Sequence, residues 1–261
     1  MLGTGNASVT NCYNSCFLIT QNDESILVDG GGGSQIFNQL KKADFNWKEI
    51  KNIIVTHKHM DHIIGIFWLV RMICQHINRD EYEGNVKIYS HDEVIYLIKD
   101  FMNKFLEEKD VNLLNERLFL IEVQDDQKID IIGSSFTFFD ILSSKTKQYA
   151  FLMEYGDKKL VCCGDEPYNP INRKYVENVD WLIHESFCLY SDEQHFKAYE
   201  KNHSTVKDAC INADKLNVKN LILFHTEDEN IRNRKELYSM EGKKYYSGNL
   251  IIPNDLEVIF L

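Results

Sequence analysis

The segment Thr56–His62 holds three histidines and one aspartate within seven residues, directly after an apolar stretch. Imidazole and carboxylate groups are the ligands that borderline divalent cations such as zinc, iron or manganese prefer. His57 and His59 stand two residues apart, so an extended segment points both side chains the same way. Asp61 and His62 can then face a second cation nearby. Because open α/β sheets bind ligands at strand ends, this segment predicts a metal site.

Further polar residues also follow apolar runs. Asp165 comes after residues 160–164 and His225 after residues 221–224, each at the exit of an expected strand. Taken alone, a Gly-Asp pair is common turn chemistry, and a single histidine is more often packed in a core than bound to a metal. Asp29 ends another apolar run before four glycines. It is either a turn residue or a carboxylate that orients a ligand imidazole.

The motif His57-x-His59-x-Asp61-His62 after a hydrophobic strand resembles the signature of the metallo-β-lactamase superfamily of binuclear metallohydrolases. Other segments fall in the superfamily's order along the chain: Leu2–Ala7, Leu27–Gly30, Gly164–Asp165 and Phe224–His225. Within the superfamily, Leu182–Ser186 followed by His203–Thr205 resembles the ribonuclease Z branch, whose members cleave phosphodiesters. The similarity covers nearly all of the chain.

The resemblance implies a fold of the α+β class, a four-layer αββα sandwich, with residues 1–261 forming one metallo-β-lactamase domain. It also implies the ligands of two metals: His57 and His59 for one, Asp61, His62 and His225 for the other, and Asp165 between them. Asp29 would hold a ligand imidazole in the right tautomer. The cofactor we expect is Zn²⁺, or Mn²⁺ or Fe²⁺, at one or two ions per chain.

The same resemblance assigns catalytic roles to three residues. The leaving alkoxide of a phosphodiester is strongly basic, so a proton donor speeds its departure. A histidine oriented by a carboxylate supplies a proton near neutral pH. The resemblance to the ribonuclease Z branch implies this role for His203, with Glu185 as the orienting carboxylate. The alternative is structural: His203 merely precedes a helix cap and Glu185 caps a neighbouring helix. Asp61 would orient the attacking water or accept its proton.

One expected ligand is missing. The superfamily supplies a further histidine about 20 residues before its Gly-Asp motif, near Leu142–Ser144 here, and the whole window 140–149 holds no histidine. We therefore expect the site of His57 and His59 to bind metal more weakly than the other. Water, substrate or a serine of that window would fill the vacant position.

A second departure concerns the substrate. The tRNA-binding arm of some ribonuclease Z enzymes has no room here, because Phe151 to Asp165 holds only two strands and a turn. We expect a metal-dependent phosphodiesterase acting on RNA at the tRNA 3′ end or on a smaller nucleotide phosphodiester. One alternative is a thioester or lactam hydrolase on the same fold, which would not need Glu185 or His203. The other is a catalytically impaired metal-binding protein, suggested by the lost ligand.

Composition limits the other possibilities. A length of 261 residues allows one substantial core or two fused half-domains. The net charge of −11 argues against general affinity for nucleic acid, but bound dications would still attract an anionic substrate.

No apolar run suits a membrane span, no signal peptide is visible, and the seven cysteines lack a disulfide-scaffold spacing. We expect a reduced, cytoplasmic protein without a membrane partner. The resemblance allows a homodimer. Lysine clusters, such as that of Lys145 and Lys147, are interpreted as solvated turns.

Periodicity predicts the elements that position these residues. The predicted strands are Cys16–Thr20, Ser25–Asp29, Asn52–Thr56, Val86–Ser90, Leu118–Val123, Ser135–Asp140, Ala150–Tyr155, Lys159–Cys163, Trp181–His184, Asn220–His225 and Leu256–Leu261. The predicted helices are Ser34–Ala43, Ile64–Ile77, Asp92–Glu107, Ser204–Leu216 and Asn230–Tyr238. Ser34 and Ser204 are the expected helix N-caps.

Overall fold

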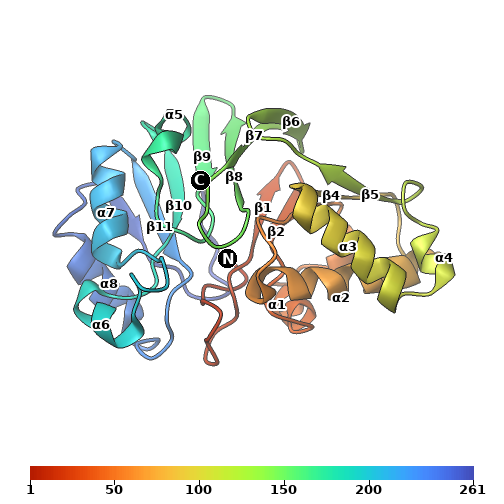
Figure 1. Ribbon diagram of the computed structural model, residues 1–261, viewed down its shortest axis with the longest axis horizontal. Helices are drawn as coiled ribbons and strands as arrows, with labels where there is room; N and C mark the ends of the chain where they lie inside the picture. Colours follow the sequence, from red (N-terminus) through yellow and green to blue (C-terminus); the bar gives the residue numbers. More distant parts are fainter.

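The computed structural model of the protein describes residues 1–261, which form two sheets flanked by helices (Figure 1). The first half contains β1 (Phe17–Gln21), β2 (Glu24–Val28), α1 (Ile36–Lys42), β3 (Asn52–Ile54), α2 (Met60–Ile77), β4 (Val86–Ser90), α3 (Asp92–Phe105), α4 (Glu108–Val111) and β5 (Leu118–Glu122). The second half contains β6 (Gln127–Ile131), β7 (Ser134–Asp140), β8 (Tyr149–Tyr155), β9 (Lys158–Cys162), α5 (Arg173–Val176), β10 (Trp181–Glu185), α6 (Glu193–Phe196), α7 (Val206–Lys215), β11 (Asn220–Phe224), α8 (Arg234–Gly242) and β12 (Asn249–Ile251).

The two sheets are mixed. The five-stranded sheet has the order β1-β2-β3-β4-β5, with β1 antiparallel to β2 and the other neighbours parallel. The seven-stranded sheet has the order β12-β11-β10-β9-β8-β7-β6, in which β9 to β12 are parallel and β6 to β9 antiparallel. Helices α1 to α4 lie beside the first sheet and α5 to α8 beside the second (Figure 1).

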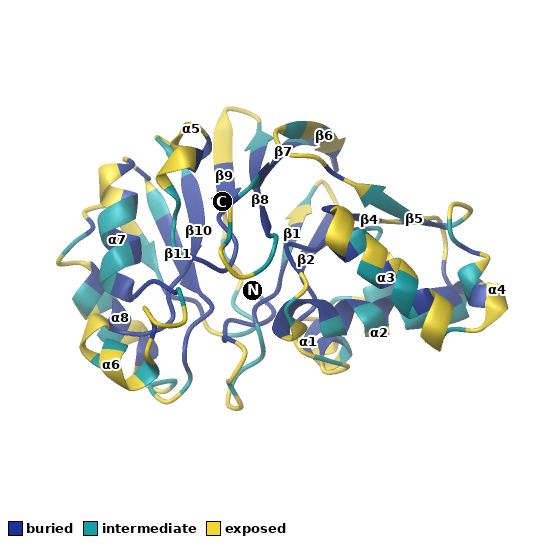
Figure 2. Cartoon of the chain, viewed as in Figure 1, coloured by how far each residue is buried: buried dark blue, intermediate teal, exposed yellow.

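Three apolar cores separate the four layers. One lies between the first sheet and its helices, one between the second sheet and its helices, and one between the two sheets. Strand β10 shows how period-two alternation supplies two of them: Trp181 and Ile183 enter the core between the sheets, whereas Leu182 enters the core under the helices. Figure 2 shows the central strands as mostly buried and the outer helix faces as exposed. The predicted four-layer αββα sandwich is therefore confirmed.

The parallel strands bring the predicted site residues to one edge. Strands β2, β3, β9 and β11 end shortly before segments that carry these residues, and β10 ends at Glu185 itself. Parallel neighbours end at the same edge of a sheet. A backbone hydrogen bond from Tyr149 N to Thr56 O, 3.0 Å long, joins the two sheets at this edge. Residues more than 150 positions apart in the sequence therefore meet in one place.

Several boundaries differ from the sequence prediction. The helix α2 begins at Met60, before the predicted Ile64, so Asp61 and His62 lie in its first turn. The predicted N-caps were wrong. Gln35 precedes α1 without a side-chain bond, and Thr205 caps α7 through reciprocal bonds with Asp208.

Strand prediction failed at both ends of the second sheet. Leu256–Leu261 is irregular, because β12 already occupies the sheet edge beside β11 and Pro253 follows it. The edge strands β6 and β12 were missed, because both are short and partly polar. The turn after β6 has positive φ at Ile132 and Gly133, which suits a tight hairpin.

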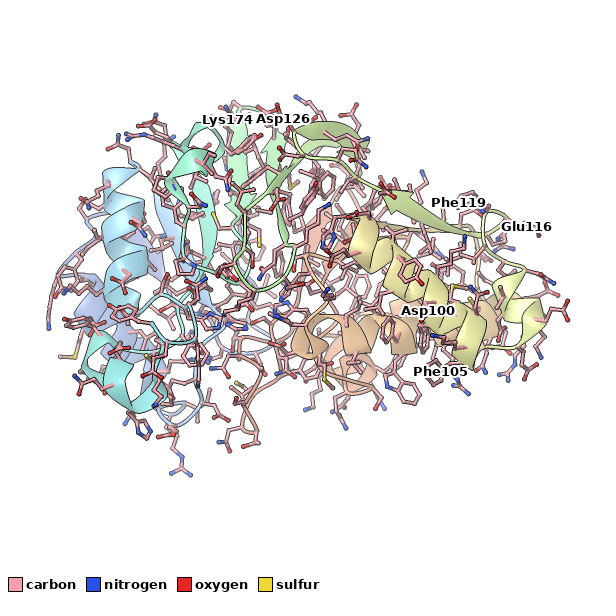
Figure 3. The ribbon with its side chains drawn as sticks, in the orientation of Figure 1. Asp100, Phe105, Glu116, Phe119, Asp126 and Lys174 are labelled. Carbon is pink, nitrogen blue, oxygen red and sulfur yellow. The ribbon has the colours of Figure 1, made fainter.

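Helix α3 buries only some of its apolar side chains. Ile98 belongs to the core, but Phe101 stacks between Phe67 and Phe105, and Phe105 is 74% exposed at the end of the helix (Figure 3).

A homodimer stays a prediction. All seven cysteines are free, and none of the helices combines the length and the apolar character that crossing a bilayer requires.

Candidate metal centre

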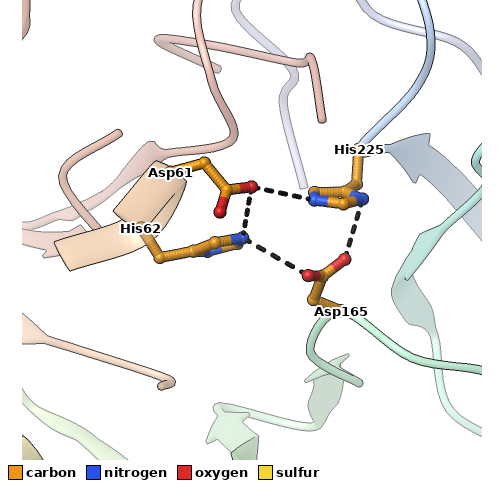
Figure 4. Close-up of side chains that lie close together, drawn as sticks. All are labelled: Asp61, His62, Asp165 and His225. Carbon is orange, nitrogen blue, oxygen red and sulfur yellow. Dashed lines mark hydrogen bonds and ion pairs between the residues drawn. The ribbon is translucent and has the colours of Figure 1, made fainter. Parts of the chain in front are cut away.

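Four buried side chains converge at the centre of the shared sheet edge (Figure 4). Asp61 and His62 come from the first turn of α2, Asp165 follows β9, and His225 follows β11. Asp61 Oδ2 lies 3.3 Å from His225 Nε2 and 3.5 Å from His62 Nε2. On the opposite side, Asp165 lies 2.7 Å from His225 Nδ1 and 3.6 Å from His62 Nε2. The donor atoms of all four residues fall within 4.8 Å of one another.

A second cluster shares Asp165. His57 Nε2 lies 2.9 Å from His59 Nδ1, and Asp165 Oδ2 lies 3.6 Å from the former and 4.0 Å from the latter. Asp165 therefore stands between the two groups, in the bridging position that the resemblance implies. The structure brings together all six predicted ligands in the two expected sets.

Asp29 orients two of the imidazoles. Its carboxylate accepts hydrogen bonds from the Thr56 amide and hydroxyl at 2.8 and 2.7 Å and from His62 Nδ1 at 2.8 Å. Because the Thr56 hydroxyl donates its only proton to Asp29, His57 Nδ1 must donate a hydrogen bond to the Thr56 hydroxyl oxygen, 2.9 Å away. Both imidazoles therefore turn an Nε2 lone pair towards the clusters. This is the arrangement that metal-ligating histidines require.

Three potential metal-ligand atoms of the site have no hydrogen-bond partner, and a bound cation would satisfy them. His62 Nε2, Asp165 Oδ1 and His225 Nδ1 are buried without a hydrogen-bond partner. The last two lie 2.7 Å apart but are not aligned as a hydrogen bond. Buried polar atoms without partners are costly, and imidazole and carboxylate are the donors that zinc prefers. The residues present therefore fit a divalent metal.

Electrostatics agree with a cation site. Burial raises the pKa of Asp165, but His225 and the neighbouring imidazoles outweigh it and hold that pKa well below its usual range. Burial lowers the pKa of His225, and Asp165 raises it to a net value of about 9. Burial, with help from His62, keeps the pKa of His57 well below the ordinary value. Metal binding would displace the protons that these imidazoles share with the carboxylates.

The predicted proton donor lies beside the metal ligands. His203 Nδ1 is 3.6 Å from Glu185 Oε2 and 3.7 Å from Asp165 Oδ1, and both residues of the pair are buried. The other oxygen of Glu185 accepts a hydrogen bond from Ser204 N. Glu185 ends β10 and His203 precedes the cap of α7, so one strand and one helix start fix the pair.

A cavity of about 440 Å³ opens onto this centre. Its lining includes residues that sequence reasoning did not assign to the site, namely Lys145, Phe187 and Lys201. The ring of Phe187 stacks on His203 with centroids 4.7 Å apart. A larger cavity of about 650 Å³ lies between the sheets, lined mostly by apolar residues and partly by the chain from Leu256 to Leu261. It contains none of the predicted site residues, so the smaller cavity is the candidate substrate site.

Residues 142–144, where the missing histidine is expected, make other contacts. Ser143 Oγ donates to Glu166 Oε1 at 2.5 Å, and Ser144 Oγ accepts from Asn202 Nδ2 at 3.2 Å. Leu142 is 55% exposed. Both serine hydroxyls therefore have hydrogen-bond partners from other parts of the chain. The expected loss of one protein ligand at the site of His57 and His59 therefore has no replacement among the serines.

Comparisons with known proteins agree with this architecture. The family model described as "Anti-Pycsar protein Apyc1" matches residues 1–241. A ribonuclease Z from Borrelia duttonii (strain Ly) is 26% identical over an alignment covering 98% of this chain and 94% of the relative.

Two solved structures share the fold. The metallo-β-lactamase fold protein YhfI from Bacillus subtilis superposes with a TM-score of 0.76 at 22% identity, covering 97% of this chain and 94% of that one. The short form of human tRNase Z gives a TM-score of 0.74 at 21% identity, covering 99% and 97%. With such relatives and such a donor set, the chain is a metal-dependent hydrolase of the metallo-β-lactamase fold.

Proposed function

The chain belongs to the family of the anti-Pycsar protein Apyc1, and on that premise we propose that it hydrolyses a small nucleotide phosphodiester, such as a cyclic nucleotide or a short RNA. One observation carries the proposal: a histidine backed by a carboxylate, His203 with Glu185, lies 3.7 Å from the shared ligand Asp165. A proton donor beside a metal suits departure of an alkoxide. Thiolate and amide-type leaving groups do not require this pair.

The expected zinc, manganese or iron would be held by His57 and His59 on one side and by Asp61, His62 and His225 on the other, with Asp165 between. Such an ion would neutralise phosphate oxygens and lower the pKa of a water.

The protein's own groups would handle the protons. Asp61 stands in the first turn of α2, where the helix dipole favours its charge, and it lines the cavity, so it can orient the water or accept its proton. His203 lines the same cavity and would protonate the leaving oxygen. Glu185 Oε2 lies 3.6 Å from His203 Nδ1, beyond a direct hydrogen bond, so Glu185 would help to orient the imidazole by its charge while Nε2 faces the cavity beside Lys145.

The size of the site favours a small substrate. Strands β8 and β9 are joined only by Gly156 and Asp157, so this connection carries no tRNA-binding arm. A cavity of about 440 Å³ lies within the usual range for small-molecule sites. The net charge of −11 offers no general attraction for a long nucleic acid. Cleavage at a tRNA 3′ end, the activity suggested by the names of the relatives, is therefore the second candidate.

The test compares substrates on metal-loaded protein. Bis-p-nitrophenyl phosphate, a panel of cyclic nucleotides and a tRNA precursor separate the phosphodiesters, and a thioester and a β-lactam test the alternative hydrolases. We expect turnover of the phosphodiesters, with a cyclic nucleotide preferred over the precursor. Absence of any phosphodiester cleavage with Zn²⁺ or Mn²⁺ would refute the proposal.

Variants of histidine test the proton donor. His203→Ala should lower kcat on a cyclic nucleotide by about 10²- to 10⁴-fold. The loss should be much smaller on bis-p-nitrophenyl phosphate, whose leaving group needs no proton. His195→Ala is the matched control, because His195 is exposed and pairs with Glu229 away from the cavity. Equal losses on both substrates would contradict the assigned role.

A further inference from the structure

The loop that lacks the expected ligand is held in a defined position. Glu166, which is buried, accepts Ser143 Oγ at one carboxylate oxygen and Asn202 Nδ2 at the other, across 2.5 and 2.9 Å. Ser143 Oγ in turn accepts the amide of Lys145 at 3.1 Å. The loop is therefore fixed by its neighbours in the absence of a metal ligand, and the side chain that it presents is Lys145.

Lys145 faces the site without an acidic partner. Its Nζ lies 3.3 Å from His203 Nε2, and it forms no ion pair with a carboxylate. Lys147, two residues further on, pairs with Asp92 at 2.6 Å outside the cavity. In a chain with a net charge of −11, an unpaired ammonium at the mouth of a cavity is a distinctive feature.

A second cation lies on the same wall. Lys201 Nζ lies 5.0 Å above the ring of Phe187, which stacks on His203, and Lys201 also lines the cavity without an ion pair. Lys145 Nζ has only the 3.3 Å hydrogen bond to His203 Nε2, so its other two N–H groups are free for an acceptor in the cavity. An anionic oxygen between the two lysines would accept from Lys145 and lie close to Lys201. The two lysines thus give this wall of the cavity a positive charge that suits an anion.

We infer that Lys145, assisted by Lys201, binds the non-bridging oxygens of the scissile phosphate. This inference rests on the proposed function and deepens it. The ammonium supplies a positive charge on the side where the lost histidine weakens metal binding. It also selects substrates, because a phosphodiester carries a negative charge at the reacting centre and a thioester does not. Lysine commonly binds phosphate as a point charge.

The test uses three variants of the metal-loaded full-length protein. Lys145→Gln removes the charge, Lys145→Arg keeps it, and Lys147→Gln is the control on the same loop. A hydrogen bond to a charged group implies that Lys145→Gln raises KM for bis-p-nitrophenyl phosphate about 10- to 100-fold, with a smaller change in kcat. Lys145→Arg should stay within about threefold of wild type and Lys147→Gln within about twofold, the scale of a surface substitution.

Equilibrium binding supplies a readout that does not depend on turnover. Calorimetry should show that p-nitrophenyl phosphate, the monoester product, binds Lys145→Gln more weakly by the same factor. Metal content by elemental analysis should be unchanged, because Lys145 is not a ligand. Lys145→Met provides a second neutral variant, and thermal melting checks that each variant folds.

The outcomes separate this inference from the proposed function. An unchanged KM and unchanged product binding in Lys145→Gln would overturn it, and so would a loss confined to kcat, which would mean that Lys145 acts only on His203. If wild type cleaved no phosphodiester, the proposed function would fail while product binding still tested Lys145. In that case weaker binding by the neutral variants would support the anion site, and equal or absent binding would overturn it.

Discussion

The contact between α2 and the loop after β2 is so close that one methyl group should disturb the site. A Cβ added at Gly65 would lie 1.8 Å from the carbonyl oxygen of Gly30, where ordinary contact begins at 3.4 Å. Two backbone hydrogen bonds, Gly65 N to Gly31 O and Gly30 N to His62 O, hold the loop and helix together at 2.9 and 2.8 Å. Gly65→Ala must therefore push α2 away from the loop.

The size of the effect follows from two opposing terms. Alanine favours a helix interior over glycine by about 1 kcal/mol. Overpacking costs about 1 to 3 kcal/mol, and the clash here is with backbone, which cannot rotate away. We expect a net loss of about 1 to 2 kcal/mol in the free energy of unfolding, since the upper part of that range outweighs the gain. Metal affinity should fall as well, because α2 carries Asp61 and His62.

Urea denaturation and metal titration measure both effects. Gly33→Ala is the matched control from the same loop, since its added Cβ meets nothing within 4 Å. It should leave stability within about 0.5 kcal/mol of wild type and metal affinity unchanged. A Gly65→Ala protein as stable as wild type, with the same metal affinity, would refute the reasoning.

Three further predictions concern the metals and a helix cap. Protein purified without added metal should contain fewer than two ions per chain by elemental analysis, and Ser144→His should raise that number; two tightly held ions in the unmodified protein would contradict the weak site. Asp29→Asn should weaken metal binding about 10- to 100-fold in a chelator competition, because His62 loses its orienting acceptor; unchanged affinity would contradict this. Thr205→Ala should cost about 1 kcal/mol in urea denaturation, whereas Ser204→Ala, whose hydroxyl has no partner, should cost less than about 0.5 kcal/mol; the opposite ranking would restore Ser204 as the cap.

The candidate ligands could be found from the sequence because each follows a strand. Asp165 and His225 come directly after apolar runs, and parallel strands of one sheet necessarily end at one edge. The position of the first turn of α2 could not be found so easily. The motif residues Met60 to His62 lack a helical apolar pattern of their own, so periodicity placed the start of the helix four residues late.

Lys145 shows what local patterns miss. Its sequence neighbours predict a solvated turn, and the residue is indeed exposed. Its function as a site residue depends on Glu166 and Asn202, which lie 21 and 57 positions further along the chain and fix the loop by hydrogen bonds. Contacts of this kind leave no periodic signal. The absence of a histidine near residues 142–144 drew attention to the right segment of the chain, but it did not indicate that the ammonium of Lys145 lies in the cavity there.

The shared carboxylate Asp165 has a mechanical consequence. Residues 57–62 belong to the half of the chain that builds the first sheet, whereas Asp165 and His225 belong to the half that builds the second. A bound ion would thus act as a cross-link between the halves, at an edge also joined by ion pairs and by backbone hydrogen bonds such as Tyr149 N to Thr56 O and Asn6 N to Thr226 O. A ligand at 100 times its dissociation constant stabilises the native state by about 2.7 kcal/mol. Chelation should therefore let this edge open locally, so that its amides exchange faster while the opposite ends of the sheets stay protected.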